Sequence, residues 1–171
     1  MKNFENKKII SEINENDKFF KISFPSKWNL VEYVLNHARK FINKFYSCGY
    51  IPEFEIISYE LLSNAIEHGN KNNPEKNVFF EISFLLEKKF RITVEDEGEG
   101  FDFKAFSCAS DSGQSSIKRG YHLIEVFSDK IEYNNKGNRI SVYFSLNDIS
   151  KVNKPDSGMN PDENNKTSIF L

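Results

Sequence analysis

One helical segment restricts the possible fold of this 171-residue chain more than any other feature. Apolar side chains at helical spacing predict a helix over residues 53–68 and leave only a narrow polar stripe on its surface. The apolar face consists of Phe54, Ile57, Leu61 and Ala65, and the polar stripe of Glu60, Asn64, Glu67 and His68. Polar groups on a mostly buried helix cost desolvation free energy unless something binds them, so the stripe is a candidate site.

The other apolar patterns predict further strands and helices along the chain. We expect strands at residues 19–24, 78–86, 90–95, 130–134 and 139–146, and further helices at residues 30–45 and 121–127. Gly69 is expected to cap the helix that carries the stripe. This order predicts an α+β fold, a two-layer α/β sandwich with helices on one face of a mixed, mostly antiparallel sheet.

Composition indicates one folded domain with polar ends. The length suits a single domain, and 17 Phe and 7 Tyr supply material for its core. Residues 1–17 are predicted to be a flexible leader, residues 18–148 the domain and residues 149–171 a disordered tail. A net charge of −2 argues against direct nucleic-acid binding. The sequence has no secretory leader, no apolar run of membrane-spanning length and no CxxC pair, so we expect a cytoplasmic protein without a membrane partner.

Three segments carry groups that could take part in chemistry, and the first is the polar stripe. The amide oxygen of Asn64 is a good ligand for Mg²⁺, and the Glu60 carboxylate could accept a proton from an attacking hydroxyl. A helix whose polar residues only cap it or bridge to loops would explain the stripe equally well.

The other two segments are rich in glycine. Residues 95–101 read Glu-Asp-Glu-Gly-Glu-Gly-Phe, either a plain acidic turn or a place where a flat ligand approaches the backbone and Asp96 accepts a hydrogen bond from its amine. Residues 118–124 read Lys-Arg-Gly-Tyr-His-Leu-Ile, either an ordinary loop-to-helix junction or a helix N-terminus whose unpaired amides suit phosphate.

In this order and spacing, the three segments resemble the N box and the two glycine boxes of the GHKL ATPase superfamily, which includes DNA gyrase and the catalytic domains of histidine kinases. The motifs that carry the resemblance are Glu-x-x-x-Asn-Ala-x-x-His-Gly-Asn at residues 60–70 and Asp-x-Gly-x-Gly-Phe-Asp at residues 96–102. Both are typical of the anti-sigma-factor serine/threonine protein kinases of bacteria. The resemblance covers roughly residues 19–146.

The resemblance implies a role for each matching residue. Glu60 would be the general base, Asn64 the Mg²⁺ ligand and Asp96 the partner of the adenine amino group. Gly98 and Gly100 would shape the floor of an ATP pocket, and residues 102–119 would form a lid over it. The other residues expected to contact the nucleotide are His68, Lys118, Arg119, Gly120, Tyr121 and Leu123.

The implied function is transfer of a phosphoryl group from ATP to a hydroxyl of an anti-anti-sigma (STAS-type) partner, together with sequestration of a sigma factor, by a homodimer. The chain departs from the family pattern at Lys118, where a glycine is common, and at Ser116, where some relatives have arginine. An alternative therefore stays open, a nucleotide-dependent switch that binds a partner without kinase activity. A detached histidine-kinase catalytic domain is less favoured, because no phospho-acceptor helix pair precedes residue 19.

Overall fold

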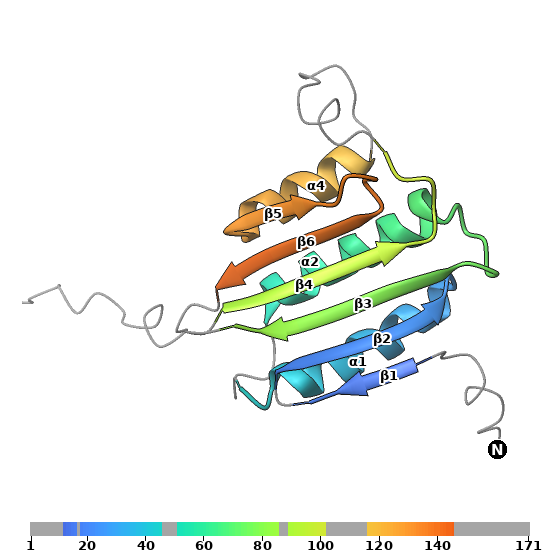
Figure 1. Cartoon of the computed structure of the whole chain (residues 1–171). Coiled ribbons are helices and arrows are strands. Elements are labelled where there is room, and N and C mark those ends of the chain that lie inside the picture. Colours follow the sequence, from blue (N-terminus) through green and yellow to red (C-terminus); the bar gives the residue numbers. More distant parts are fainter. Residues whose placement is uncertain (1–11, 17, 46–50, 86–88, 102–115, 146–171) are drawn as a thin grey trace, which may run out of the picture.

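Six strands and three α-helices make up the part of the chain that the structure describes (Figure 1). This computed structural model describes residues 12–16, 18–45, 51–85, 89–101 and 116–145. The strands are β1 (Glu12–Glu15), β2 (Phe19–Pro25), β3 (Asn77–Phe84), β4 (Lys89–Asp96), β5 (Lys130–Tyr133) and β6 (Arg139–Ser145). The helical elements are the 3₁₀ turn η2 (Trp28–Leu30), α1 (Val31–Ile42), α2 (Pro52–Asn64), the π-helical turn η3 (Ala65–Gly69) and α4 (Ser116–Phe127). Of the helices described, none is both long enough and apolar enough to span a bilayer.

The strands form one sheet in the order β1-β2-β3-β4-β6-β5. The three α-helices cover one face of this sheet, and α2 lies between α1 and α4 (Figure 1). The predicted α+β sandwich is therefore confirmed. The sheet is not mixed, however, because every pair of neighbouring strands in the described residues is antiparallel. The short turn between β5 and β6 accounts for one of these pairs, since a connection this short can join only antiparallel strands.

A phenylalanine-rich core fills the space between the sheet and the helices. In β2 the side chains of Phe20 and Phe24 point into this core, and both are completely buried. The predicted apolar face of α2 is buried as well, with no residue of that face more than 4% exposed. The most deeply buried phenylalanines are Phe20, Phe24, Phe41, Phe54, Phe80, Phe90 and Phe144. This packing fixes α2 on the sheet and so determines where its polar stripe can lie.

Two element boundaries differ from the sequence prediction. Residues 12–15, which were predicted to belong to a flexible leader, form β1 and pair with β2, with Glu12 opposite Ser23. An edge strand that pairs through its backbone needs no apolar run, so the sequence pattern misses it. Helix α4 begins at Ser116 and not near Tyr121. The predicted tail and most of the predicted lid lie outside the described residues.

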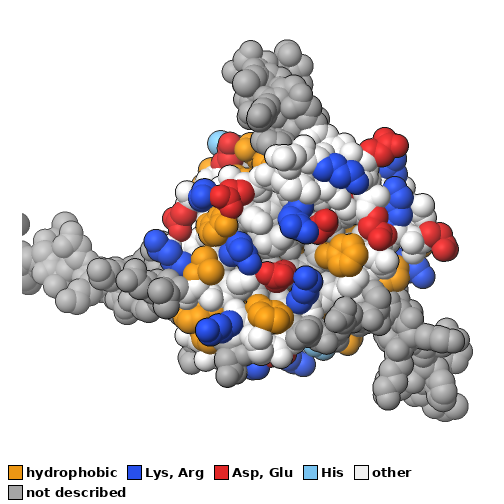
Figure 2. All heavy atoms as spheres, viewed as in Figure 1, with side chains coloured by type: hydrophobic (Ala, Val, Ile, Leu, Met, Phe, Trp, Pro, Cys, Tyr) orange, Lys and Arg blue, Asp and Glu red, His pale blue; other side chains and the backbone are white. Residues whose placement is uncertain are grey.

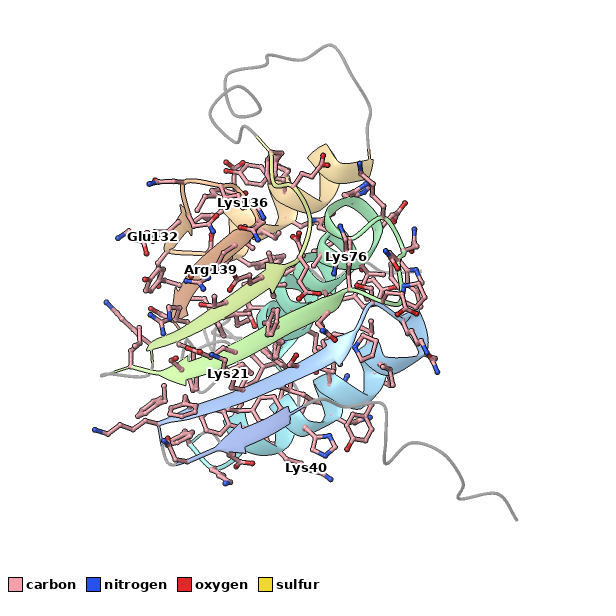
Figure 3. The ribbon with its side chains drawn as sticks, turned by 45° about the vertical axis from the view of Figure 1, so that its right-hand side comes forward. Lys21, Lys40, Lys76, Glu132, Lys136 and Arg139 are labelled. Atoms are coloured by element: carbon pink, nitrogen blue, oxygen red, sulfur yellow. The ribbon has the colours of Figure 1, made fainter. Side chains whose placement is uncertain are left out.

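The face of the sheet opposite the helices carries charges of both signs among scattered hydrophobic side chains (Figure 2). Glu81 accepts a hydrogen bond from Arg91 (3.0 Å) and lies 3.6 Å from the ammonium of Lys21. Arg139 donates to Glu95 across β6 and β4 (2.6 Å). Figure 3 shows Lys21 and Arg139 over this open face. Such cross-strand pairs suit a sheet face in contact with water, whereas the candidate site lies at the side covered by helices.

Candidate functional site

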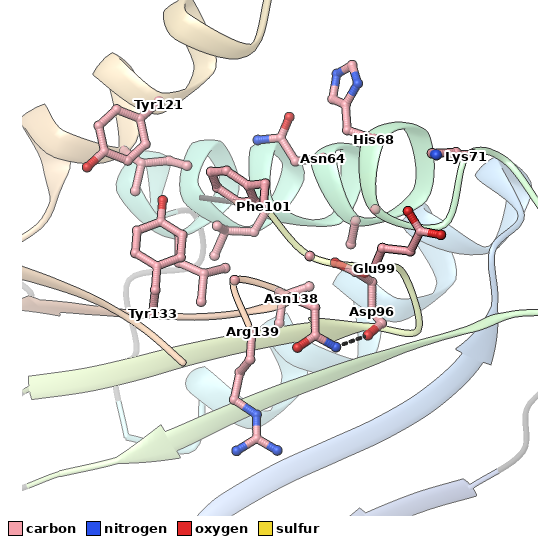
Figure 4. Close-up of a pocket in the computed structure, with 18 residues that line it drawn as sticks. Asn64, His68, Lys71, Asp96, Glu99, Phe101, Tyr121, Tyr133, Asn138 and Arg139 are labelled. Carbon is pink, nitrogen blue, oxygen red and sulfur yellow. Dashed lines mark hydrogen bonds between the residues drawn. The ribbon is translucent and has the colours of Figure 1, made fainter. Parts of the chain in front are cut away.

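A cavity of about 270 Å³ opens between α2, the end of β4, α4 and the turn that joins β5 to β6 (Figure 4). Its apolar walls include Leu61, Ala65, Val94, Ile124 and Ile140. Its polar lining includes Asn64, His68, Lys71, Asp96, Glu99 and Asn138. Arg139 also borders the cavity, but its guanidinium points away from it and pairs with Glu95. A concave, largely apolar space with a few converging polar groups is the usual form of a small-molecule site.

The polar stripe on α2 forms one wall of this cavity. Asn64 ends α2 and His68 follows in η3, and both residues line the cavity. In Figure 4 the two side chains project from the same edge of the helix. The helix widens in η3, where the amide of Asn70 donates to the carbonyl of Ala65 (2.8 Å). Single π-helical turns are frequent at functional sites. Here the turn brings Gly69 against the end of β4.

Asp96, the last residue of β4, lies where the end of the helix meets the end of the strand. A Cβ atom on Gly69 would lie 2.3 Å from Cγ of Asp96, and a Cβ atom on Gly98 would lie 2.2 Å from the carbonyl oxygen of Gly69. Only glycine permits an approach this close. The prediction of Gly69 as a helix cap is wrong, because the positive φ angles follow it, at Lys71 (55°) and Asn72 (56°).

The Asp96 carboxyl is partly buried in the cavity wall. Burial raises the pKa of this group, and the amide of Gly98, which donates to Oδ1 (2.8 Å), opposes the rise together with the charges of Lys136 and Lys76. A carboxylate accepts hydrogen bonds and has no donor, so Asp96 favours a ligand that presents an amine at this end of the cavity.

The turn between β5 and β6 closes the cavity beneath Asp96. Gly100 has a φ of +80°, and a Cβ atom there would lie 1.9 Å from the carbonyl oxygen of Lys136. The side-chain amide of Asn138 donates to the backbone carbonyl of Asp96 (2.6 Å, dashed in Figure 4). The Asn134 side chain accepts hydrogen bonds from the amides of three residues of the turn, Gly137, Asn138 and Arg139. The turn is thus a rigid part of the site, although the sequence predicted only a hairpin there.

Three aromatic side chains line the cavity opposite Asp96. The rings of Phe101 and Tyr133 are 5.7 Å apart and nearly perpendicular. Tyr121 of α4 and Tyr133 of β5 face each other in Figure 4, and burial raises the pKa of both phenols. Aromatic surfaces of this kind suit a planar ligand.

Glu60 lies one turn before Asn64 on α2 and does not line the cavity. It packs against α4, because a Cβ atom on Gly120 would lie 2.2 Å from Oε2 of Glu60. Burial raises the pKa of the Glu60 carboxyl. A carboxylate with a raised pKa is a stronger proton acceptor, which suits a general base.

The structure brings some of the predicted site residues together and leaves others apart. The predicted residues that line the cavity are Asn64, His68, Asp96, Gly100 and Tyr121. Gly98 is buried behind the wall, and Leu123 is 40% exposed and does not reach the cavity. Gly120 was expected at a helix N-terminus with a free amide, but it lies beyond the first four residues of α4, where helix amides are already paired. The side chains of Lys118 and Arg119 lie outside the described residues.

Sequence reasoning missed the cavity residues that come from the β5–β6 turn and from the segment after η3. These are Tyr133, Gly137, Asn138, Arg139, Ile140 and Lys71. The sequence signal for these residues is an asparagine at each end of a glycine turn, Asn134 and Asn138. Because many ordinary hairpins have the same pattern, it does not indicate a place in a binding site.

Comparison with known proteins gives one family and several structural matches. A family model described as the histidine kinase-like ATPase domain matches residues 28–144. Seven chains of solved structures match. One is the histidine kinase domain of the blue-light activated histidine kinase from Erythrobacter litoralis EL346, with 18% identity and a TM-score of 0.43. The match covers 72% of this chain and 62% of that domain, so the chain spans less than two thirds of its length. No curated protein sequence gives a significant match.

The family model covers more than half of the chain and includes every residue that lines the cavity. The resemblance to the GHKL superfamily is therefore confirmed, whereas membership of the anti-sigma branch stays a prediction. This chain belongs to the family of histidine kinase-like ATPase domains.

Proposed function

We propose that the chain binds ATP with Mg²⁺ in this cavity and is an anti-sigma regulatory factor with serine/threonine protein kinase activity. One observation carries the proposal: a single helix presents, in order, a carboxylate of raised pKa (Glu60), a carboxamide (Asn64) and the glycine that meets Asp96 (Gly69). Gly69 lies nine positions after Glu60, which is about 13 Å along a helix. This gives an elongated ligand a different partner at each end.

The adenine ring is assigned to the end of the cavity at Asp96. Its amino group would donate to the Asp96 carboxylate, and its faces would lie against the apolar and aromatic walls. The phosphates would then extend along α2 past His68 and Asn64 toward Glu60. Asn64 would supply one amide oxygen to Mg²⁺, a cation that usually takes few protein ligands and fills its shell with water and phosphate oxygens.

The kinase assignment rests on Glu60. A hydroxyl oxygen of the protein substrate would attack the γ-phosphorus, its proton would pass to the Glu60 carboxylate, and the bond to the leaving oxygen of ADP would break. Burial raises the pKa of Glu60, which favours proton transfer to it. The proposed substrate is an anti-anti-sigma (STAS-type) protein, and a sigma factor is the proposed second partner of a cytoplasmic homodimer. These partners follow from the resemblance of the motifs at residues 60–70 and 96–102.

The test is incubation of the full chain with Mg²⁺, radiolabelled ATP and a STAS-type protein. We expect a phosphoprotein with the wild type and loss of transfer in Glu60→Ala, with ATP affinity within about threefold of the wild type because Glu60 does not line the cavity. Glu67→Ala is the matched control, since Glu67 is an exposed carboxylate of the same stripe. Unchanged transfer in Glu60→Ala would contradict the assigned role of this residue.

A second candidate is a nucleotide-dependent switch that binds its partner without phosphorylating it. It is favoured by the position of Glu60, which packs against Gly120 and not into the cavity, and by Lys118 in place of a glycine. Under this proposal, ATP changes the affinity for the partner, and no label reaches the partner in the same assay. The absence of ATP binding in calorimetry would count against both candidates.

A further inference from the structure

Two buried asparagines hold opposite sides of one peptide group at the end of β4. The carbonyl of Asp96 accepts a hydrogen bond from Nδ2 of Asn138 (2.6 Å), and the amide of the next residue, Glu97, donates to Oδ1 of Asn70 (2.9 Å). These two groups belong to the same planar peptide unit. Asn70 is 1% exposed and Asn138 is 8% exposed, so water competes little for either bond.

Asn70 is itself held by its other polar atoms. Its Nδ2 donates to Oγ of Ser26 (2.7 Å), at the end of β2, and to the carbonyl of Asn77 (2.8 Å), at the start of β3. The amide of Asn77 in turn donates to Oε2 of Glu97 (2.6 Å). Asn70, Asn77 and Glu97 thus form a closed ring of hydrogen bonds that joins three segments. Asn70 cannot rotate without breaking several of these bonds.

Asn138 lies on the other side of β4, next to β6, and is held there. Its Oδ1 accepts a hydrogen bond from the side-chain amide of Asn134 (2.8 Å), and its backbone carbonyl accepts one from the amide of Asp96 (3.0 Å). The peptide group after Asp96 is therefore bonded to two rigid side chains from different parts of the fold. Beyond it lie Gly98 and Gly100, where the absence of a Cβ atom lets the backbone pass close to the carbonyl groups of Gly69 and Lys136.

We propose that Asn70 and Asn138 are positioning residues for Asp96: through the peptide group that follows Asp96, they fix the direction in which its carboxylate meets the ligand. Asn70 does so from outside the cavity, whereas Asn138 also lines it. A fixed peptide plane restricts ψ of Asp96, and hence the direction of its side chain. The proposal rests on the proposed function, since it assigns Asp96 to the adenine amino group. Loss of either asparagine should therefore lower the preference for ATP over a purine nucleotide without the amino group, in addition to any loss of protein stability.

The test compares the affinity for ATP with that for purine riboside triphosphate, which lacks the 6-amino group. In Asn70→Ala and in Asn138→Ala we expect the preference for ATP to fall about tenfold, with a small change for the analogue. The carboxylate of Asn70→Asp still accepts from the Glu97 amide but can donate to neither Ser26 nor Asn77, so we expect lower stability and an unchanged preference. Ser26→Ala is the matched control, because it removes one bond of Asn70 and leaves the one to Glu97.

Hydrogen exchange of the Glu97 amide, measured without nucleotide, makes the result independent of the proposed function. Asn70→Ala should lower the protection of this amide at least about tenfold, and Ser26→Ala should not. Equal losses of affinity for both nucleotides, or unchanged exchange in Asn70→Ala, would overturn the positioning role. If the wild type binds neither nucleotide, the proposed function fails, and the exchange result still decides whether the two asparagines hold the peptide. If Asn70→Ala does not fold, Asn138→Ala and Asn70→Asp provide the same comparison.

Discussion

The helical segment from Glu60 to Gly69 has the same arrangement at both of its ends, a glycine that faces a carboxylate. At one end Gly69 of η3 meets Asp96, and at the other Gly120 of α4 meets Glu60. In both places a Cβ atom would come closer than 2.5 Å to an atom of the carboxyl group. Burial also raises the pKa of both carboxyls. The two ends differ in what else holds the carboxylate.

Asp96 has a short side chain at the end of a strand, and hydrogen bonds hold both its carboxylate and its backbone. Glu60 has a longer side chain in mid-helix, and no hydrogen bond to its carboxylate is found within the described part of the chain. Nearby on α2, the buried hydroxyls of Ser58 and Ser63 also have no hydrogen-bond partner in that part. The Asp96 end is thus held in place by hydrogen bonds, whereas among the described residues only packing against Gly120 is found at the Glu60 end.

The largest expected effect comes from Asp96→Asn. Because the amide of Gly98 donates a hydrogen bond to Oδ1, the asparagine side chain should keep its oxygen at that position. Its NH₂ group then points toward the ligand, where two hydrogen-bond donors, this group and the amine of the ligand, would face each other. We expect ATP affinity to fall about a hundredfold in isothermal titration calorimetry, as is typical for loss of a hydrogen bond to a charged group.

Glu95→Gln is the control for this prediction, because Glu95 is the preceding carboxylate and pairs with Arg139 on the open face of the sheet. Its ATP affinity should stay within about twofold of the wild type. A similar loss in both variants would mean that net charge, and not the direction of the Asp96 carboxylate, sets the affinity.

Gly69→Ala should have the next largest effect. The new Cβ atom would overlap a carboxylate that cannot move away, so the contact between η3 and β4 has to open. Overpacking of this kind lowers the free energy of unfolding by about 1–3 kcal/mol. Displacement of Asp96 should also weaken ATP binding by at least about tenfold. Chemical denaturation and calorimetry measure the two losses. Unchanged ATP affinity at lowered stability would contradict the assignment of Asp96 to the ligand.

The part of this site that could be predicted from sequence is the part that local patterns encode. The stripe on α2 follows from helical periodicity, and the turn after Asp96 from glycine spacing, so Asn64 and Asp96 were found. Asn138 was not found, since it contacts a residue 42 positions away and looks like any turn asparagine. Gly69 was assigned to the wrong role, because its sequence position suits a helix cap while its actual neighbour comes from β4. β1 was missed because backbone pairing leaves no apolar pattern.

Gly120→Ala should have a smaller and different effect from Gly69→Ala. The nearest atom to the new Cβ is Oε2, the far end of a flexible side chain, so Glu60 can rotate away. Alanine also favours the helix over glycine by about 0.5–1 kcal/mol, so stability should not fall. We expect phosphoryl transfer to drop about tenfold while ATP affinity stays within about threefold. A loss of stability like that of Gly69→Ala would remove the distinction between the two ends.

The smallest expected effect is a shift in the pH dependence of transfer. Transfer requires the ionised form of Glu60, so the rate should decline on acidification, with a midpoint above the ordinary glutamate pKa of 4.5 because burial raises the pKa of Glu60. In Gly120→Ala the displaced carboxylate gains contact with water, and the midpoint should move down toward the ordinary value. The measurement is the initial rate of transfer against pH, with ATP at saturation.

The raised pKa of Glu60 should also make the stability of the protein depend on pH. A carboxyl whose pKa is higher in the folded than in the unfolded protein binds its proton more tightly when folded. The contribution of Glu60 to stability is therefore present below the unfolded pKa and is lost as the pH rises through the folded pKa. Glu60→Gln should consequently become more stable relative to the wild type as the pH rises through this range, with chemical denaturation as the measurement. A difference that stays constant with pH would show that the Glu60 carboxylate is as well hydrated as an exposed one, and the contrast between the two ends would then rest on geometry alone.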